Sequence, residues 1–461
     1  MESPPRDGRV SAEQTGSSLV SRATELPDCD PRRFLAGRDA PRTYWTSPYG
    51  PEFAGGGTAA RVAGDGDDRF EAVKDAADDL FADLDYDGPE PARPRLFGGF
   101  SFHADHEPAP PWQGFGPAEF VLPRTLLTRA NGETWLTVSA LDASPEAVER
   151  ELEEVRAALA DEIDGAAGDT PTNDRTAAGP GRRGPPGVLA TESTTTREEW
   201  AEQVAAAVSR IEAGDLRKVT LAQSLRVALA GDVSVPDALA RLGESYPDCF
   251  RFCFEPTTEG AFFGATPERL ATLRGRTVEA DALAGSIGRG ATPEEDAGLE
   301  VRIENSEKMA HEHQLVVDTI RDQLAPVAGE VRVADRRVRK LATIQHLWTP
   351  IEADLTESDH VLSIVEALHP TPAVGGLPPG RALQTIRETE TFDRGWYAAP
   401  VGWFDADGDG TFAVGIRSAV TGESSATLYA GNGIVADSDP DEEYEEVQLK
   451  YRPILDELED E

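Results

Sequence analysis

The chain has little cysteine and no long apolar run. Cys29, Cys249 and Cys253 are its only cysteines, too few for a disulfide framework, so we expect a reducing compartment. Cys249 and Cys253 flank Phe250 and Phe252, and we expect them to be buried strand residues. A run of about 18 apolar residues, as a membrane helix needs, is missing. The amino terminus, MESPPRDGRV, also lacks the apolar core of a signal peptide. A soluble cytoplasmic protein is expected.

Positive charge is scarce, and this excludes two kinds of partner. The chain has 84 acidic and 44 basic residues and a formal net charge of −40. Such a charge argues against nucleic acid or an anionic membrane as a partner. The composition is typical of halophilic adaptation, in which surface carboxylates stay hydrated at high salt. A cluster of acidic residues is therefore weak evidence of a site.

Lysine is the rarest charged residue and occurs only at positions 74, 218, 308, 340 and 450. Because arginine serves elsewhere, we expect lysine where arginine cannot substitute for it. Lysine is a compact charge and, when its pKa is lowered, a general base.

The sequence contains no complete motif for a calcium, zinc or nucleotide-phosphate site. The run DADGDG at residues 405–410 imitates a calcium loop, but its twelfth position is Ile416 instead of a glutamate. We therefore expect a turn. His311 and His313 lack the four-residue spacing of zinc proteases. No P-loop, dinucleotide fingerprint or nucleophile elbow is present.

Hydrophobic patterns predict an α+β fold, because helices and antiparallel hairpins mix without a βαβ rhythm. At 461 residues the chain can form one large domain or two ordinary ones. We expect a weakly structured segment at 1–45, a first structured region at 46–163, a flexible linker at 164–194 and a second structured region at 195–461. The main expected helices are 67–84, 144–163, 196–213, a long one from about 293 to 324, and 361–368. Expected strands include 96–102, 120–124, 133–140, 218–227, 250–254, 261–264, and a hairpin of 397–404 with 412–420.

The stretch from Tyr429 to Lys450 combines a glycine-punctuated loop at 430–433 with a helix. Ser438, Asp439 and Pro440 predict the start of that helix. From there Glu443, Glu446 and Lys450 share one face, beside an apolar stripe of Tyr444, Val447 and Tyr451. Carboxylates, a lysine and bare backbone N–H groups are suited to a divalent cation with an acidic substrate. A solvated acidic face is the alternative interpretation.

Four other charged residues occur at positions where the hydrophobic pattern of the predicted strand or helix indicates an apolar residue. Lys218 opens a strand, Glu268 follows one, Glu312 lies on the buried side of a helix, and Arg417 interrupts a strand. A charge in such a place is costly unless it is paired or binds a ligand. Each alone is equally consistent with a structural ion pair.

Ordered motifs in this region resemble the chorismate-utilising enzymes, and most closely their isochorismate synthase branch. The resemblance covers about residues 196–452, with weaker echoes at 98–100 and 120–124. The motifs are GATPERL at 264–270, LAGS at 283–286, SEK at 306–308, EH at 312–313, QHL at 345–347, LHPTPAVGG at 368–376, RGWYAAPVGW at 394–403, and the closing glycine segment with its helix.

The resemblance implies two antiparallel β-sheets sandwiched by helices, with the active site in a central cleft. Residues 46–163 would then be an amino-terminal part that completes the α/β sandwich, and residues 195–461 the chorismate-binding catalytic region. It also implies addition of water at C2 of chorismate with loss of the C4 hydroxyl. Lys218 matches the base that activates water, which requires a lowered pKa. Glu268 matches the acid that protonates the leaving hydroxyl, which requires a raised pKa.

The resemblance further implies a Mg²⁺ ion, held by Glu312 and Glu446 with Glu443 as a direct or water-mediated ligand. Arg417 matches a residue that binds the enolpyruvyl carboxylate, assisted by Lys450. The full set of positions that match substrate-binding residues is Ala284, Gly285, Ser286, His313, Thr371, Arg417, Gly431, Gly433 and Lys450. Departures from the family pattern are Asn432 in the glycine segment, Ser286 for threonine, and Ala399 for glycine.

Alternatives within the family stay open. Lys218, instead of the glutamine typical of anthranilate synthases, favours water over ammonia, and Ala284 disfavours aminodeoxychorismate synthase, which has lysine there. Salicylate synthases share the base and acid and also eliminate pyruvate. A catalytically inactive homologue is disfavoured because both groups are present. We expect no glutaminase subunit, a monomer or homodimer, and a product used in menaquinone synthesis, with siderophore synthesis as the rival.

Overall fold

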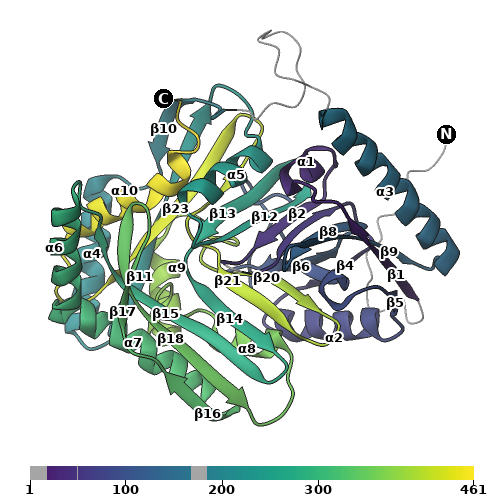
Figure 1. The fold of residues 1–461 in the computed structure, drawn as a ribbon. Helices are drawn as coiled ribbons and strands as arrows, with labels where there is room; N and C mark the ends of the chain where they lie inside the picture. Colours follow the sequence, from purple (N-terminus) through teal and green to yellow (C-terminus); the bar gives the residue numbers. More distant parts are fainter. Residues whose placement is uncertain (1–17, 49, 168–183, 461) are drawn as a thin grey trace.

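The computed structural model describes residues 18–48, 50–167 and 184–460, with the side chains of 161–167 left out. Two largely antiparallel β-sheets form its centre, and helices lie outside them (Figure 1). The predicted α+β class is therefore confirmed. In the described part of the chain, no helix is long and apolar enough to span a membrane.

The larger sheet has 13 strands among the described residues. In spatial order they are β10 (Val188–Ser193), β11 (Lys218–Leu229), β23 (Ser425–Ile434), β22 (Ser418–Thr421), β13 (Gly260–Thr266), β12 (Phe250–Thr257), β2 (Arg42–Thr46), β3 (Glu52–Gly56), β8 (Thr125–Ala130), β9 (Glu133–Leu141), β1 (Leu19–Leu26) and β5 (Asp85–Asp87), with β19 (Gly376–Leu377) beside β11. Only the pairing of β1 with β5 is parallel within this described sheet.

The smaller sheet has 10 strands in the same part of the chain. Their order is β16 (Ala328–Val333), β18 (Ile344–Leu355), β15 (Thr277–Gly288), β14 (Arg269–Arg274), β21 (Gly410–Val414), β20 (Pro400–Asp405), β6 (Arg95–Phe100), β7 (Ala118–Leu122) and β4 (Ala60–Gly64), with β17 (Arg337–Lys340) beside β18.

Both sheets combine strands from the amino-terminal and carboxy-terminal parts of the chain. Strand β12 pairs with β2, and β20 pairs with β6. The sheets contact each other through aromatic side chains: the ring of Phe53 on β3 lies 5.5 Å from Phe97 on β6 and 5.3 Å from Trp403 on β20. Such edge-to-face contacts add to the apolar burial that holds the sheets together.

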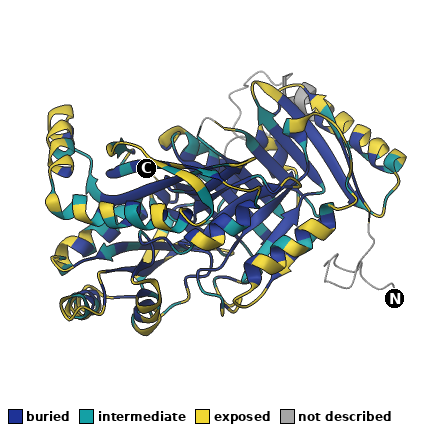
Figure 2. Cartoon of the chain, turned by 90° about the horizontal axis from the view of Figure 1, so that it is seen from below, coloured by how far each residue is buried: buried dark blue, intermediate teal, exposed yellow. Residues whose placement is uncertain are grey.

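The helices cover the outer faces of the sheets. They are α1 (Pro31–Ala36), α2 (Arg69–Phe81), α3 (Pro145–Ala167), α4 (Arg197–Glu212), α5 (Val235–Ser245), α6 (Pro293–Glu304), α7 (Glu307–Leu324), α8 (Val361–Leu368), α9 (Pro379–Thr389) and α10 (Pro440–Leu455), with a short 3₁₀ turn at Glu90–Ala92. Figure 2 shows the helices exposed on their outer sides, whereas the strands beneath them are buried. This is the expected burial of amphipathic helices.

Helix α10 begins where the sequence predicts. The carboxylate of Asp439 accepts hydrogen bonds from the backbone N–H of Asp441 at 2.9 Å and of Glu442 at 3.1 Å, and Pro440 occupies the first turn. These are favourable residues for the start of a helix. Val447 and Tyr451 are buried as predicted, so the opposite side of the helix can present charged groups to a cavity.

The predicted long helix from 293 to 324 is wrong, because it consists of two helices. α6 ends at Glu304, and the hydroxyl of Ser306 accepts a hydrogen bond from the backbone N–H of Met309 at 3.3 Å to cap α7. Ser is a strong N-cap residue and starts a new helix here.

The predicted weak structure at 1–45 is wrong from Leu19 onwards. Strand β1 pairs with β9 along its length, and α1 and β2 follow it. The predicted linker at 164–194 is also too long, because α3 extends to Ala167 and β10 pairs with β11. Residues 1–17 and 168–183, on which parts of these predictions fall, lie outside the described residues.

Two local predictions about the carboxy-terminal region are corrected as well. Residues 430–433 belong to strand β23, not to a loop, because they pair with β11 throughout. The second strand of the predicted hairpin ends at Val414, and a separate strand, β22, begins at Ser418 in the other sheet. The DADGDG turn between β20 and β21 is confirmed. Cys253 is a buried residue of β12 as expected, whereas Cys249 is buried but lies just before that strand.

Candidate active site

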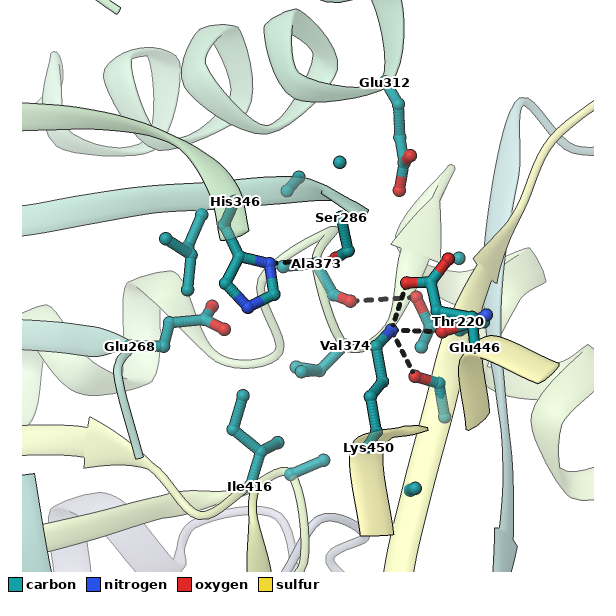
Figure 3. A pocket seen from close by; sticks show the side chains of 18 of the residues that line it. Thr220, Glu268, Ser286, Glu312, His346, Ala373, Val374, Ile416, Glu446 and Lys450 are labelled. Carbon is teal, nitrogen blue, oxygen red and sulfur yellow. Dashed lines mark hydrogen bonds and ion pairs between the residues drawn. The ribbon is translucent and has the colours of Figure 1, made fainter. Parts of the chain in front are cut away.

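One cavity of about 150 Å³ gathers nearly all of the predicted site residues. Strands β11, β15 and β23, helices α7 and α10, and the segments after β13 and β21 supply its walls (Figure 3). The predicted residues that line it are Lys218, Glu268, Ala284, Gly285, Ser286, Glu312, Arg417, Gly431, Gly433, Glu443, Glu446 and Lys450. Residues more than 200 positions apart in the sequence thus share one site.

Lys218 is the first residue of β11, and its side chain is 1% exposed. Its Nζ donates a hydrogen bond to Oε1 of Glu312 on α7 at 2.8 Å. Gly433, on the neighbouring strand β23, makes this contact possible. A Cβ atom there would lie 2.5 Å from Cε of Lys218 and 2.7 Å from Oε1 of Glu312. Glycine is therefore needed at 433 to leave room for the ion pair.

Glu268 lies between β13 and β14 and is 3% exposed. Burial raises the pKa of its carboxyl group to about 8, although the charges of Lys218 and Lys450 oppose the shift. A buried carboxyl group favours its neutral form because the charged form loses hydration. The raised pKa predicted for Glu268 is thus confirmed, and the group carries a proton at neutral pH.

Glu312 and Glu446 lie on the other side of the cavity from Glu268 (Figure 3), and a third glutamate, Glu443, lines the same cavity. Glu312 comes from α7, whereas Glu443 and Glu446 come from successive turns of α10. Each is paired with a different lysine: Glu312 with Lys218 at 2.8 Å, Glu446 with Lys450 at 2.8 Å, and Glu443 with Lys308 at 3.6 Å.

Because their surroundings differ, Glu312 and Glu443 have pKa values shifted in opposite directions. Burial raises the pKa of Glu312, but the charge and hydrogen bond of Lys218 outweigh it, and the pKa is lowered overall. Burial and then the charge of Glu446 raise the pKa of Glu443 to about 7. The amide of Asn432 donates to Oε2 of Glu443 at 2.9 Å. At neutral pH the carboxyl group of Glu443 is therefore partly protonated, whereas that of Glu312 is ionised.

The chemistry of this cluster suits a divalent cation, although its present geometry is not that of a metal site. Among the described residues, no three acidic, histidine or cysteine side chains converge closely enough to hold a metal ion as they stand. Carboxylate oxygens are nevertheless the ligands that Mg²⁺ prefers. In the structure, lysine ammonium groups supply the positive charge that a metal cation would supply at these carboxylate oxygens. The donor set thus fits Mg²⁺, provided the carboxylates turn away from the lysines.

Arg417 does not interrupt a strand, as the sequence suggested, but lies between β21 and β22 where the chain passes from one sheet to the other. Its backbone φ of 53° is incompatible with an extended strand. Its Nη2 lies 3.5 Å from Nε2 of His346, and its buried Nη1 has no hydrogen-bond partner among the described residues. A buried guanidinium with a free donor is suited to bind a carboxylate.

His346 on β18 was within a recognised motif but was not predicted as a site residue. Its Nδ1 lies 2.9 Å from Oγ of Ser286, and its ring lines the cavity between Ser286 and Arg417. Burial and the charge of Arg417 hold the pKa of His346 well below its usual value. The ring is therefore neutral at pH 7 and serves to position its two neighbours.

Arg394 and Lys308 also line the cavity without having been predicted. Arg394 is 1% exposed and bonds to the carboxylate of Glu390, to the carbonyl of Thr220 at 2.8 Å and to the carbonyl of Val374 at 2.9 Å. It thereby ties β11 to the segment before β19. Arg394 opens the motif RGWYAAPVGW, and Lys308 ends the motif SEK. Membership of these motifs could have indicated that the two residues belong to the site.

His313 and Thr371 are the predicted substrate-binding residues that do not line the cavity. The ring of His313 contacts the carbonyl of Ala284 at 3.3 Å and the hydroxyl of Thr349 at 2.8 Å. Successive helical residues point about 100° apart, so His313 faces β15 and β18 when Glu312 faces the cavity. Thr371 is buried just before Ala373 and Val374, which do line it.

Comparison with known proteins agrees with this architecture. The sequence matches the family described as chorismate binding enzyme over residues 8–459. The chain therefore belongs to the chorismate binding enzymes.

Two curated relatives and two solved structures illustrate the similarity. The chain is 37% identical to isochorismate synthase MenF of Bacillus subtilis, over 78% of this chain and 74% of that protein. It is 35% identical to the salicylate biosynthesis isochorismate synthase of Pseudomonas aeruginosa, over 94% and 88%. The structure of MenF, the menaquinone-specific isochorismate synthase from Escherichia coli, matches with a TM-score of 0.78 at 25% identity, over 96% of this chain and 95% of that one. Anthranilate synthase component I from Streptococcus pneumoniae shares the fold, with a TM-score of 0.71 at 20% identity over 89% and 93%.

Proposed function

We propose that this enzyme is an isochorismate synthase. It would convert chorismate to isochorismate by Mg²⁺-dependent addition of water at C2 with loss of the C4 hydroxyl. The observation that carries the proposal is that one cavity contains both a buried amine, Lys218, and a buried carboxylic acid, Glu268, whose raised pKa keeps it protonated. The names of the curated relatives support the same activity.

Glu268 is proposed as the acid that protonates the C4 hydroxyl as it leaves. Hydroxide is a poor leaving group, and a positioned acid accelerates such a step by about 10²–10⁴-fold. With its pKa raised to about 8, Glu268 is protonated at neutral pH, and its pKa lies close enough to that pH for it to give up the proton during the reaction.

Lys218 is proposed as the base that accepts a proton from the attacking water. In the structure its Nζ donates a hydrogen bond to Oε1 of Glu312 at 2.8 Å. Only a neutral amine accepts a proton, so the proposal requires that Glu312 turns away from Lys218 before the reaction. The lysine at this position, where glutamine is typical of anthranilate synthases, favours water as the nucleophile.

Chorismate carries two carboxylates, and the cavity offers separate cationic positions for them. Arg417, whose Nη1 has no hydrogen-bond partner in the described part of the chain, is proposed to bind the enolpyruvyl carboxylate. Lys450 lies beside the glutamate cluster, and its Nζ donates a hydrogen bond to the carbonyl of Gly431 at 2.9 Å. It is proposed to assist Arg417 in binding the enolpyruvyl carboxylate. Glu312, Glu446 and Glu443 are proposed to hold Mg²⁺, which would neutralise and orient the ring carboxylate.

The test is analysis of the products formed from chorismate by the purified protein in high salt with Mg²⁺ and without ammonia. A product isomeric with chorismate, separated by chromatography and identified by mass, is expected only when Mg²⁺ is present. Salicylate with pyruvate would indicate the lyase reaction instead. Consumption of chorismate only after ammonia is added would move the protein to the amine-transferring branch. We expect menaquinone synthesis to consume the product.

A further inference from the structure

Lysine is concentrated at this cavity in a chain that otherwise avoids it. Three of the five lysines line the cavity, and each is paired with a different glutamate of the cluster. Lys218 and Lys450 have roles in the proposed reaction. Lys308 has none, although its Nζ lies 3.6 Å from Oε1 of Glu443, the longest of the three lysine–glutamate contacts.

Lys308 differs from the other two lysines in its freedom to move. It is the second residue of α7, and its side chain is 29% exposed, against 1% for Lys218 and 15% for Lys450. Its Nζ lies 3.6 Å from Oε1 of Glu443 and donates to the carbonyl of Asp437 at 3.4 Å. Both contacts are longer than an ordinary hydrogen bond of 2.7–3.2 Å. Lys308 therefore lies at the solvent side of the cluster and is loosely held.

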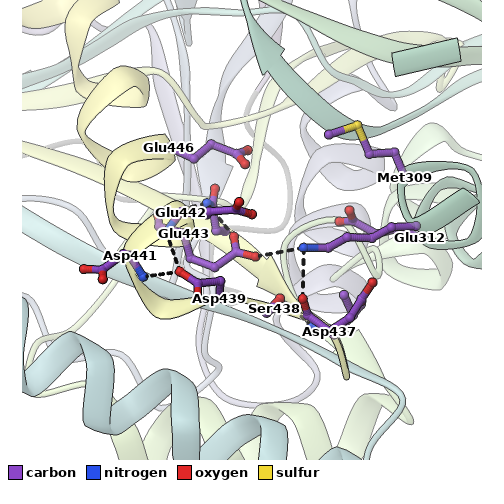
Figure 4. A network of polar contacts seen from close by, with 12 residues as sticks. Met309, Glu312, Asp437, Ser438, Asp439, Asp441, Glu442, Glu443 and Glu446 are labelled. Atoms are coloured by element: carbon purple, nitrogen blue, oxygen red, sulfur yellow. Dashed lines mark hydrogen bonds and ion pairs between the residues drawn. The ribbon is translucent and has the colours of Figure 1, made fainter. Parts of the chain in front are cut away.

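The position of Lys308 bridges two elements. Its ammonium group connects the first turn of α7 to Asp437, just before α10, and to Glu443 in the first turn of α10. Figure 4 shows both acceptors, each reached by a dashed line. An ammonium group at Glu443 and a divalent cation at the same carboxylate repel each other, because both are positive and only a few ångströms apart. Binding of the cation thus requires Lys308 to leave, and the exposed side chain can do so into solvent.

We propose that Lys308 is an exchangeable counter-ion of the Glu312–Glu443–Glu446 cluster, which a divalent cation displaces and which therefore weakens the affinity of the cluster for that cation. In the metal-free protein, Lys308 stabilises Glu443 and keeps the segment before α10 close to α7. This inference rests on the metal site of the proposed function, but it concerns the binding of the cation alone.

The experiment is titration of the full chain with Mn²⁺ in the absence of chorismate, at one fixed concentration of potassium chloride, with free Mn²⁺ measured by electron paramagnetic resonance. Removal of the competing charge in Lys308→Met is expected to tighten Mn²⁺ binding by about five- to tenfold. Lys340→Met is the matched control. Lys340 also pairs with carboxylates, those of Asp296 and Glu300, but it does not line the cavity. Its variant should bind Mn²⁺ as the unmodified protein does.

Unchanged or weaker Mn²⁺ binding by Lys308→Met, with normal binding by the unmodified protein, would overturn the inference and leave the proposed function intact. Absence of Mn²⁺ binding from the unmodified protein and both variants would contradict the metal site itself, and the inference with it. Lys308→Gln serves as a second variant if the methionine variant does not fold, and the same tightening is expected of it.

Discussion

Single residues in the cavity combine burial with charge, and Glu268 shows the consequence most directly. Its carboxyl group has a pKa of about 8 in the folded protein against an ordinary value near 4.5. Its contribution to stability is thus fully present below about pH 4.5 and is lost as the pH rises through about 8. Catalysis by the acid follows the same direction, so kcat is expected to fall as the pH rises through about 8.

Substitution of Glu268 by glutamine should separate these two effects. Glutamine cannot donate the proton, so kcat of Glu268→Gln is expected to fall by about 100-fold or more. The variant should keep its thermal stability between pH 7 and 9, where the unmodified protein loses some, because it has no carboxyl group to ionise. Denaturation curves across this pH range and a kcat profile are the measurements.

Glu198→Gln, on the exposed first turn of α4, is the control and should change neither property. A normal turnover rate in Glu268→Gln would mean that the acid lies elsewhere.

Gly433 is a second position in the cavity where a small substitution should have a large effect, because there is no room for a Cβ atom. In Gly433→Ala the new methyl group would collide with both Lys218 and Glu312, so the ion pair has to separate. We expect a loss of about 1–3 kcal/mol in the free energy of unfolding, as for other overpacked sites, and a loss of turnover that is larger than the loss of stability explains. Urea denaturation and kcat measured in parallel test this.

Gly298→Ala on α6 is the matched control, because nothing lies within 4 Å of a Cβ atom there. That variant is expected to gain up to about 1 kcal/mol, since alanine is the better helix former. Full activity in Gly433→Ala would show that the reaction tolerates displacement of the Lys218 and Glu312 side chains.

Among the elements, helix α10 matters most to the site because it carries Glu443, Glu446 and Lys450 on one side and its core contacts on the other. Its orientation relative to α7 sets the spacing of the glutamate cluster. The start of the helix depends on one exposed side chain, that of Asp439, which caps two backbone N–H groups.

Removal of that cap in Asp439→Ala is expected to destabilise the protein by about 1 kcal/mol. Because the first turn carries Glu443, the variant should also bind Mn²⁺ less tightly. Chemical denaturation and the metal titration described above measure both effects. Asp439→Asn keeps an oxygen acceptor at the cap and should remain close to the unmodified protein; an equal loss in both variants would assign the effect to the charge of Asp439 instead of its hydrogen bonds.

For the whole molecule, the dominant property is the net charge of −40. Repulsion among surface carboxylates opposes the compact state, and salt screens it because the Debye length falls from about 10 Å at 0.1 M to about 3 Å at 1 M. We therefore expect the melting temperature to rise steadily as potassium chloride increases from 0.1 to 2 M. Differential scanning calorimetry measures this, and a melting temperature that is constant or falls with salt would argue against salt adaptation.

The sequence alone determined the elements whose signals are local. The caps at Asp439 and Thr196, the apolar stripes of α2 and α10, and the turn at 405–410 follow from residues within a few positions of one another. The break between α6 and α7 at Ser306 was not predicted, because a capping serine inside a continuous helical pattern is a weak signal. The burial of β1 could not be foreseen either, since its partner, β9, lies more than 100 residues away.

The residues of the site were largely identifiable from the sequence, because their motifs match a known family, but their relations to one another were not. That Lys218 pairs with Glu312, 94 residues away, that Gly433 leaves room for this pair, and that His346 links Ser286 to Arg417 depend on the packing of β11, β18, β23 and α7. Local hydrogen bonds and hydrophobic periodicity involve residues only a few positions apart, so the order of residues in the sequence is enough to predict them. Charge pairing and burial act through space, so only the tertiary structure decides them.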